Sequence, residues 1–159
     1  MAAIDLAVAA IAGLLALSGV AVALRRYRGV SGFVYAASAA LCVALALLGG
    51  LVLATRAGPA GLSLPIGLPW IGASLRLDAL SALFLVLLGT GGATASVYGI
   101  GYGRHEEEPL RVLAFFPGFL GAMGLVLLAD DAFTFLMSWE VMSLLSWALV
   151  LTHHRAAAA

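Results

Sequence analysis

Glu140 is the charged residue that falls near the middle of an apolar run, residues 132–151. A carboxyl group at the centre of a membrane helix costs about 2.5–3.5 kcal/mol to insert, so an ionisable side chain there usually marks an ion path or a proton relay. Helical spacing puts Ser143 on the same helix face as Glu140, where it is the polar neighbour of the carboxyl group. We therefore expect Glu140 to be a proton-relay carboxylate and Ser143 an accessory group. The alternative is a neutral carboxyl that only fixes helix packing through a hydrogen bond.

Two further polar pairs flank this run. His153 and His154 follow it, and imidazole titrates near neutrality, so the pair is a candidate for proton delivery at the mouth of a path. A solvated histidine pair is the alternative. Asp130 and Asp131 precede the run, where a carboxylate can cap the first turn of a helix.

A membrane carboxylate needs a counterpart if it is to carry charge, because burial without one favours its protonated form. The sequence contains eight arginines and no lysine, and none of the arginines lies inside an apolar run. The partner of Glu140 is therefore either water or a cation outside this sequence.

Composition sets the class of protein. Hydrophobic residues make up 64% of the chain and charged residues 10%, and the mean hydropathy is +1.12. Such a chain cannot cover a soluble core with polar groups, so we expect an integral membrane protein in contact with the lipid bilayer. The zero net charge gives no basic face for nucleic acid.

The sequence offers no pattern for a cofactor or a metal. Cys42 is the single cysteine, which excludes an intrachain disulfide and a cysteine cluster. No glycine-rich dinucleotide loop follows a strand pattern. We expect this chain to bind no cofactor and no metal, and not to be a redox catalyst by itself.

Five apolar runs are long enough to cross about 30 Å of hydrocarbon, and helices satisfy their own backbone groups in lipid. We predict an all-α fold, one membrane domain over residues 1–159, with helices at residues 4–24, 30–54, 77–102, 112–129 and 132–151. The connection 55–76, rich in glycine and proline, predicts a short loop or hairpin. Its apolar pieces are residues 62–64 and 65–71.

Arginine placement orients the predicted bundle. Six of the eight arginines fall in the connections after the first and third runs and after the fifth, against two, Arg56 and Arg76, on the other side. The positive-inside rule then puts the N-terminus outside, the C-terminus in the cytoplasm and the 55–76 connection outside.

Small residues at four-residue spacing predict close helix packing in two of the runs. They are Gly91, Ala95, Gly99 and Gly103 in the third, and Ala114, Gly118 and Ala122 in the fourth. Pro117 should kink the fourth helix, because its ring removes a backbone donor.

Three ordered segments resemble a known superfamily. They are Leu-Arg-Leu-Asp-Ala-Leu-Ser-Ala-Leu-Phe at residues 75–84, Tyr-Gly-Ile-Gly-Tyr at 98–102, and Leu-Leu-Ala-Asp-Asp-Ala-Phe at 127–133 leading to Trp139 and Glu140. Together they resemble the antiporter-like membrane subunits of proton-pumping NADH–quinone oxidoreductases, membrane-bound hydrogenases and multi-subunit sodium/proton antiporters. The segment 135–144 most resembles the hydrogenase-4 component B and formate hydrogenlyase branch. The resemblance runs from about residue 75 to residue 155.

The resemblance implies a role for Glu140, which matches the fifth-helix glutamate that those subunits use with a lysine on a broken seventh helix to gate proton movement. Family members have about fourteen helices, so this chain corresponds to the N-terminal five-helix portion, whether split or truncated. We expect its partners to be other membrane subunits of a hetero-oligomeric complex, including one that supplies the missing helices and the relay lysine. The expected location is a prokaryotic inner membrane, which the chain would cross several times.

Three functions follow as hypotheses. The first is the N-terminal part of a proton-translocating subunit in a membrane-bound oxidoreductase or hydrogenase complex. The second is a structural or assembly subunit of such a complex that conducts no ions. The third is a small homo-oligomeric proton-coupled exporter, which also needs only one membrane glutamate per protomer.

Overall fold

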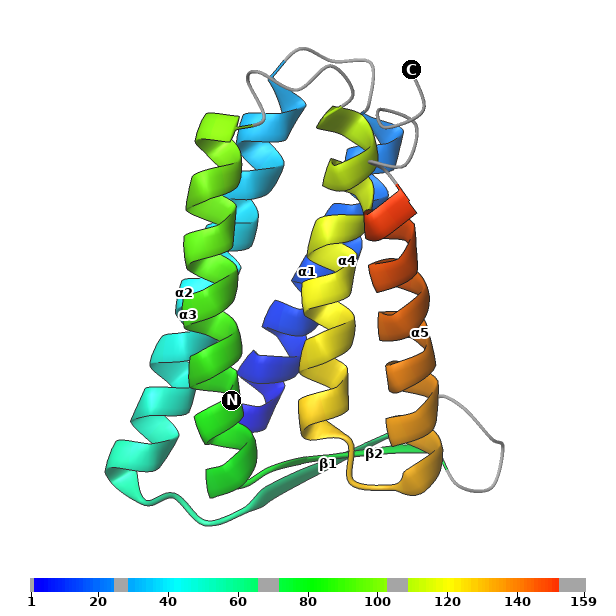
Figure 1. The fold of residues 1–159 in the computed structure, drawn as a ribbon. Helices are drawn as coiled ribbons and strands as arrows, with labels where there is room; N and C mark the ends of the chain where they lie inside the picture. Colours follow the sequence, from blue (N-terminus) through cyan, green and yellow to red (C-terminus); the bar gives the residue numbers. More distant parts are fainter. Residues whose placement is uncertain (1, 25–28, 66–71, 103–108, 152–159) are drawn as a thin grey trace.

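The computed structural model describes residues 2–24, 29–65, 72–102 and 109–151, without the side chains of residues 102 and 109–111. These residues form five helices and a two-stranded hairpin (Figure 1). The elements are α1 Ala3–Ala23, α2 Val30–Thr55, β1 Ala60–Leu64, β2 Ala73–Leu77, α3 Ala79–Tyr102, α4 Pro109–Leu128 and α5 Ala132–Leu151. The predicted helical character of the chain is confirmed.

Four helices are long and apolar enough to cross a membrane within the described ranges: α1, α2, α3 over Ala79–Gly101, and α5. The corresponding apolar stretch of α4, Val112–Leu128, is shorter. The helices lie side by side, and the hairpin runs across one end of the bundle (Figure 1). The described residues therefore form a helical membrane protein with four candidate spans.

Two predicted helix starts were wrong, each for a local reason. The third helix begins at Ala79 and not at residue 77, because residues 73–77 pair as strand β2 and the Asp78 carboxylate accepts the Ser81 N–H at 2.9 Å as an N-terminal cap. The fourth helix begins at Pro109 and not at residue 112. Proline suits a first helical position, which the apolar pattern does not detect.

Glycines set how closely α3 approaches α2. A Cβ added at Gly89 would lie 2.4 Å from the Cys42 carbonyl oxygen, and one at Gly99 would lie 2.6 Å from the Tyr35 ring. A Cβ at Gly91 would meet nothing within 4 Å. The predicted stripe 91–95–99–103 is therefore confirmed as a packing position at Gly99 and wrong at Gly91, which is exposed and points away from α2. The contact with α2 runs through Gly89, Gly92 and Gly99. Gly103 lies outside the described residues.

The fourth helix lies between α1, α3 and α5 and contacts all three. Its predicted small residues are confirmed as packing positions, since Ala122 is fully buried and a Cβ at Gly118 would lie 2.9 Å from the Ser18 hydroxyl of α1. The helix continues through Pro117, and the Ser18 hydroxyl donates a hydrogen bond to the Ala114 carbonyl one turn before this proline. Side-chain hydroxyls of this kind tie neighbouring membrane helices together.

The predicted loop or hairpin is a hairpin, with β1 and β2 antiparallel and Leu62 opposite Leu75. The second strand is Ala73–Leu77. Residues 66–71, most of the expected apolar piece 65–71, lie outside the described part of the chain. Leu75 also forms an antiparallel bridge with Ala129 in the α4–α5 connection. Through strand β2, the hairpin therefore contacts the connection that precedes α5.

Candidate functional site

Helix α5 carries the candidate carboxylate, and Asp131 fixes where this helix starts. The Thr134 N–H donates to Asp131 Oδ1 at 2.8 Å, and the Thr134 hydroxyl donates to Asp131 Oδ2 at 2.6 Å. The Ser74 N–H of the hairpin donates to the same Oδ2 at 2.9 Å. The predicted capping role of this acidic pair is confirmed for Asp131. These hydrogen bonds, the Thr134 hydroxyl foremost, lower the pKa of the Asp131 carboxyl.

The other aspartate of the pair has a different role. Arg76 Nε lies 3.1 Å from Asp130 Oδ1 and 3.8 Å from Asp78 Oδ2. The Asp130 N–H also donates to the Ser74 carbonyl at 2.9 Å. The pKa of the Asp78 carboxyl is lowered, first by the Ser81 N–H that it caps and further by the Arg76 charge. One arginine therefore lies between the carboxylates that precede α3 and α5.

Glu140 lies about 12 Å along α5 from Ala132, counted as helix rise. Glu140 is exposed, and so are Leu136, Leu144 and Trp147 on the same face of α5. The buried residues of α5 are Thr134 and Ser138. Among the described residues, α5 packs against α4 and β2, so Glu140 faces away from the other helices.

The structure does not bring the predicted site residues into one cluster. Ser143 is exposed on the Glu140 face, one turn further along α5. No hydrogen bond or ion pair reaches the Glu140 carboxyl from any residue that the structure describes. His153 and His154 lie outside the described residues. A proton relay through Glu140, Ser143, His153 and His154 therefore stays a prediction.

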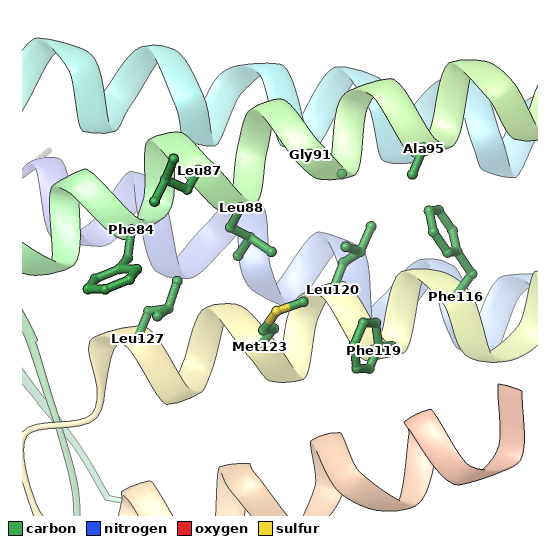
Figure 2. A pocket seen from close by; sticks show the side chains of 11 residues that line it. Phe84, Leu87, Leu88, Gly91, Ala95, Phe116, Phe119, Leu120, Met123 and Leu127 are labelled. Atoms are coloured by element: carbon green, nitrogen blue, oxygen red, sulfur yellow. The ribbon is translucent and has the colours of Figure 1, made fainter. Parts of the chain in front are cut away.

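A groove between α3 and α4 has no polar side chain in its wall (Figure 2). Its volume is about 410 Å³, and it lies between Phe84, Leu87 and Gly91 on α3 and Phe116, Leu120 and Met123 on α4. Glu140 does not line it. An apolar groove of this kind excludes water and ions, so it offers no path to the carboxylate.

Sequence reasoning missed the contacts between the hairpin and α5. Arg76, Asp78 and Asp130 occur in the quoted segments, but Arg76 entered the prediction only as a charge that orients the chain. A polar residue directly before each of two apolar helices is the signal that could have been used. In the described ranges, no group of three or more His, Cys, Asp or Glu side chains could hold a metal ion.

No family model matches the chain. An uncharacterized protein of Mycobacterium tuberculosis is 40% identical over 87 residues, which are 55% of this chain and 14% of that protein. Hydrogenase-4 component B of Escherichia coli is 35% identical over 80 residues, 49% of this chain and 12% of that component. NADH-quinone oxidoreductase subunit L of M. tuberculosis is 26% identical over 156 residues, 91% of this chain and 25% of that subunit.

These partial similarities support the antiporter-like superfamily, at low identity. The similarity to the antiporter-like relatives is partial and of low identity, and the chain spans at most a quarter of the length of those compared above. Two of them are named as a component or a subunit of a larger assembly. Together with the four helices that are long and apolar enough to cross a membrane, these relatives support a multi-pass membrane protein.

Proposed function

We propose that this chain is the N-terminal part of a proton-translocating antiporter-like subunit in a membrane-bound oxidoreductase or hydrogenase complex, with Glu140 as the relay or gating carboxylate. The chain would cross a prokaryotic inner membrane five times, with the shorter apolar helix α4 as one of the five spans. The N-terminus and the hairpin would lie outside and the C-terminal end in the cytoplasm, as the arginine distribution predicts.

One observation carries the proposal: Glu140 lies mid-way along a helix of spanning length, on the face that the other described helices leave open. A carboxyl facing lipid costs about 2.5–3.5 kcal/mol, so this position favours a protein-covered face. The exposed Trp139, Leu144 and Trp147 on α5 supply the apolar surface that such a contact buries.

The proposed counterpart of Glu140 is a cation on another membrane segment or subunit. A cation within about 4–6 Å favours the ionised carboxylate, and its withdrawal favours the protonated form. Alternation between the two states takes up and releases a proton. Ser143, one turn away, would donate to the ionised form, and His153 and His154 would exchange protons with the cytoplasm.

The test compares proton translocation per electron transferred by the assembled complex in inside-out vesicles. Glu140→Gln keeps the shape and removes the titration, so proton pumping should fall at least about tenfold. Glu140→Asp should keep part of it. Leu136→Gln, an amide on the same exposed face, controls for assembly and should pump normally. Unchanged pumping by Glu140→Gln would overturn the relay.

A non-conducting structural subunit is the second candidate. It is favoured by the apolar walls of the α3–α4 groove and by the absence of any polar partner for Glu140 among the described side chains. Under this alternative, Glu140→Gln would lower the yield of assembled complex and leave the pumping of the assembled fraction intact.

A further inference from the structure

A second cavity lies beside the first two turns of α5. It has a volume of about 410 Å³ and is enclosed by α1, the hairpin, α4 and α5. Ser138 lines it, and Ser138 and Glu140 are separated by about 200° around the helix axis. Glu140 does not line the cavity.

Most of the cavity wall is apolar, with Ile11, Leu75 and Phe133 among the lining residues. Its polar side chains are the hydroxyls of Thr134 and Ser138, which are 8% and 7% exposed. The Thr134 hydroxyl donates to Asp131. The Ser138 hydroxyl lies on the cavity wall and makes no hydrogen bond to a residue in the part of the chain that the structure describes.

A hydroxyl that faces an apolar cavity favours a ligand that offers it a hydrogen bond, because the hydrocarbon groups around it offer none. A cavity of several hundred cubic ångströms with apolar walls and one or two polar groups is the usual form of a small-molecule site. No charged side chain lines this one, so a charged ligand would lose its hydration without compensation.

The exposed residues among those that line the cavity indicate the side from which a ligand would enter. Ala12 on α1 and Met137 on α5 are exposed, whereas Ile11, Leu75 and Ser138 are buried. The cavity thus opens between two helices of spanning length, and Ser138 lies about 9 Å of helix rise beyond Ala132. This opening is continuous with the exposed apolar surface of these two helices and lies at the depth of the hydrocarbon.

From the Ser138 hydroxyl, the apolar wall and the membrane-side opening, we infer that this cavity binds a neutral aliphatic molecule dissolved in the membrane, with one hydroxyl or carbonyl group bonded to Ser138. Such a ligand touches both the hairpin, through Leu64 and Leu75, and the first turns of α5. This inference concerns binding and does not depend on the relay role of Glu140.

The experiment labels the assembled protein in native membranes with a dodecanol that carries a photoreactive diazirine. Adducts should form at cavity residues such as Met137 and Leu75, and unlabelled dodecanol should compete with them. Dodecane with the same diazirine should bind more weakly, because it lacks the hydroxyl.

Matched variants separate the site from general contact with lipid. Ser138→Ala should weaken dodecanol binding about fivefold, the effect of one neutral hydrogen bond, while Ser143→Ala on the open face should not. Ala12→Leu should block the opening and abolish competition, while Ala16→Leu, one turn away and also exposed, should not. Labelling that does not saturate, labelling equal to that of Leu47 on the exposed side of α2, or identical affinity in Ser138→Ala would each overturn the inference.

Discussion

Arg76 Nε lies 3.1 Å from Asp130 Oδ1, which ties the second hairpin strand to the connection between α4 and α5. The same connection is held by Ser74, whose carbonyl accepts from the Asp130 N–H and whose N–H donates to Asp131. The start of α5, and with it the height of Glu140 in the bundle, is thus set by the hairpin as well as by α4.

The ion pair and the cap should differ in their importance for stability. Arg76 and Asp130 are both partly exposed, so Arg76→Ala should lower the free energy of unfolding by less than about 1 kcal/mol. Asp131→Ala should lower the thermal midpoint in detergent more, because it removes both the α5 cap and the acceptor of the Ser74 N–H. If Arg76→Ala lowered the thermal midpoint in detergent as much as Asp131→Ala or more, this assignment would be contradicted.

The effect of Asp131 should depend on pH. Its pKa is lowered in the folded protein, so its ionised form stabilises the fold above its unfolded pKa of about 3.9, and this contribution is lost as the pH falls through the folded pKa. Asp131→Asn keeps a capping side chain without the charge. Its thermal midpoint should be below that of the wild type at pH 7, and the two should converge below about pH 4. A difference that is constant from pH 3 to pH 7 would exclude this cause.

The glycine contacts predict a contrast between two neighbouring positions of α3. Gly89→Ala should lower the free energy of unfolding by about 1–3 kcal/mol, because the added Cβ meets backbone atoms of Cys42 and Ala46 at 2.4 and 2.6 Å. Gly91→Ala should be neutral or slightly stabilising, since nothing lies near its Cβ. Thermal unfolding of both variants in one detergent measures the contrast, and equal midpoints would disprove the packing described here.

How far the sequence predicts this structure differs from element to element. The apolar runs predict the helices because membrane helices need only length and hydropathy, and Asp131 is recognisable as a cap from its position alone. The face of α3 that packs is harder to predict. The small residues Gly89, Gly92 and Gly99 and the small residues Gly91, Ala95 and Gly99 both fit helical spacing, and only the position of α2 decides between the two sets.

Long-range polar contacts are the other gap. Arg76 and Asp130, and Ser74 and Asp131, come together through the hairpin, and no local pattern encodes that pairing. The sequence does predict that Glu140 is an isolated membrane carboxylate. It could not predict which side of α5 faces α4, because Thr134 and Ser138, which are buried, are more polar than the exposed Leu136 and Leu144.

The open face of α5 should contact protein in the assembled complex. Leu144 is 56% exposed, a fraction close to the 59% of Leu51 on α2. A photo-crosslinking benzoylphenylalanine in place of Leu144 should capture another membrane helix. The same residue in place of Leu47, 70% exposed on α2, serves as the comparison and should capture mainly lipid. Lipid adducts alone at position 144 would contradict a protein-covered relay face.

The central claim is that Glu140 changes its protonation during turnover. Infrared difference spectra of the assembled complex, taken between its resting and its reduced states, detect the carbonyl stretch of a protonated carboxyl group. The relay predicts that such a band appears or disappears in the wild type, shifts in Glu140→Asp and is absent in Glu140→Gln. Identical carboxyl bands in the wild type and Glu140→Gln would show that Glu140 keeps one protonation state throughout, which would contradict the relay.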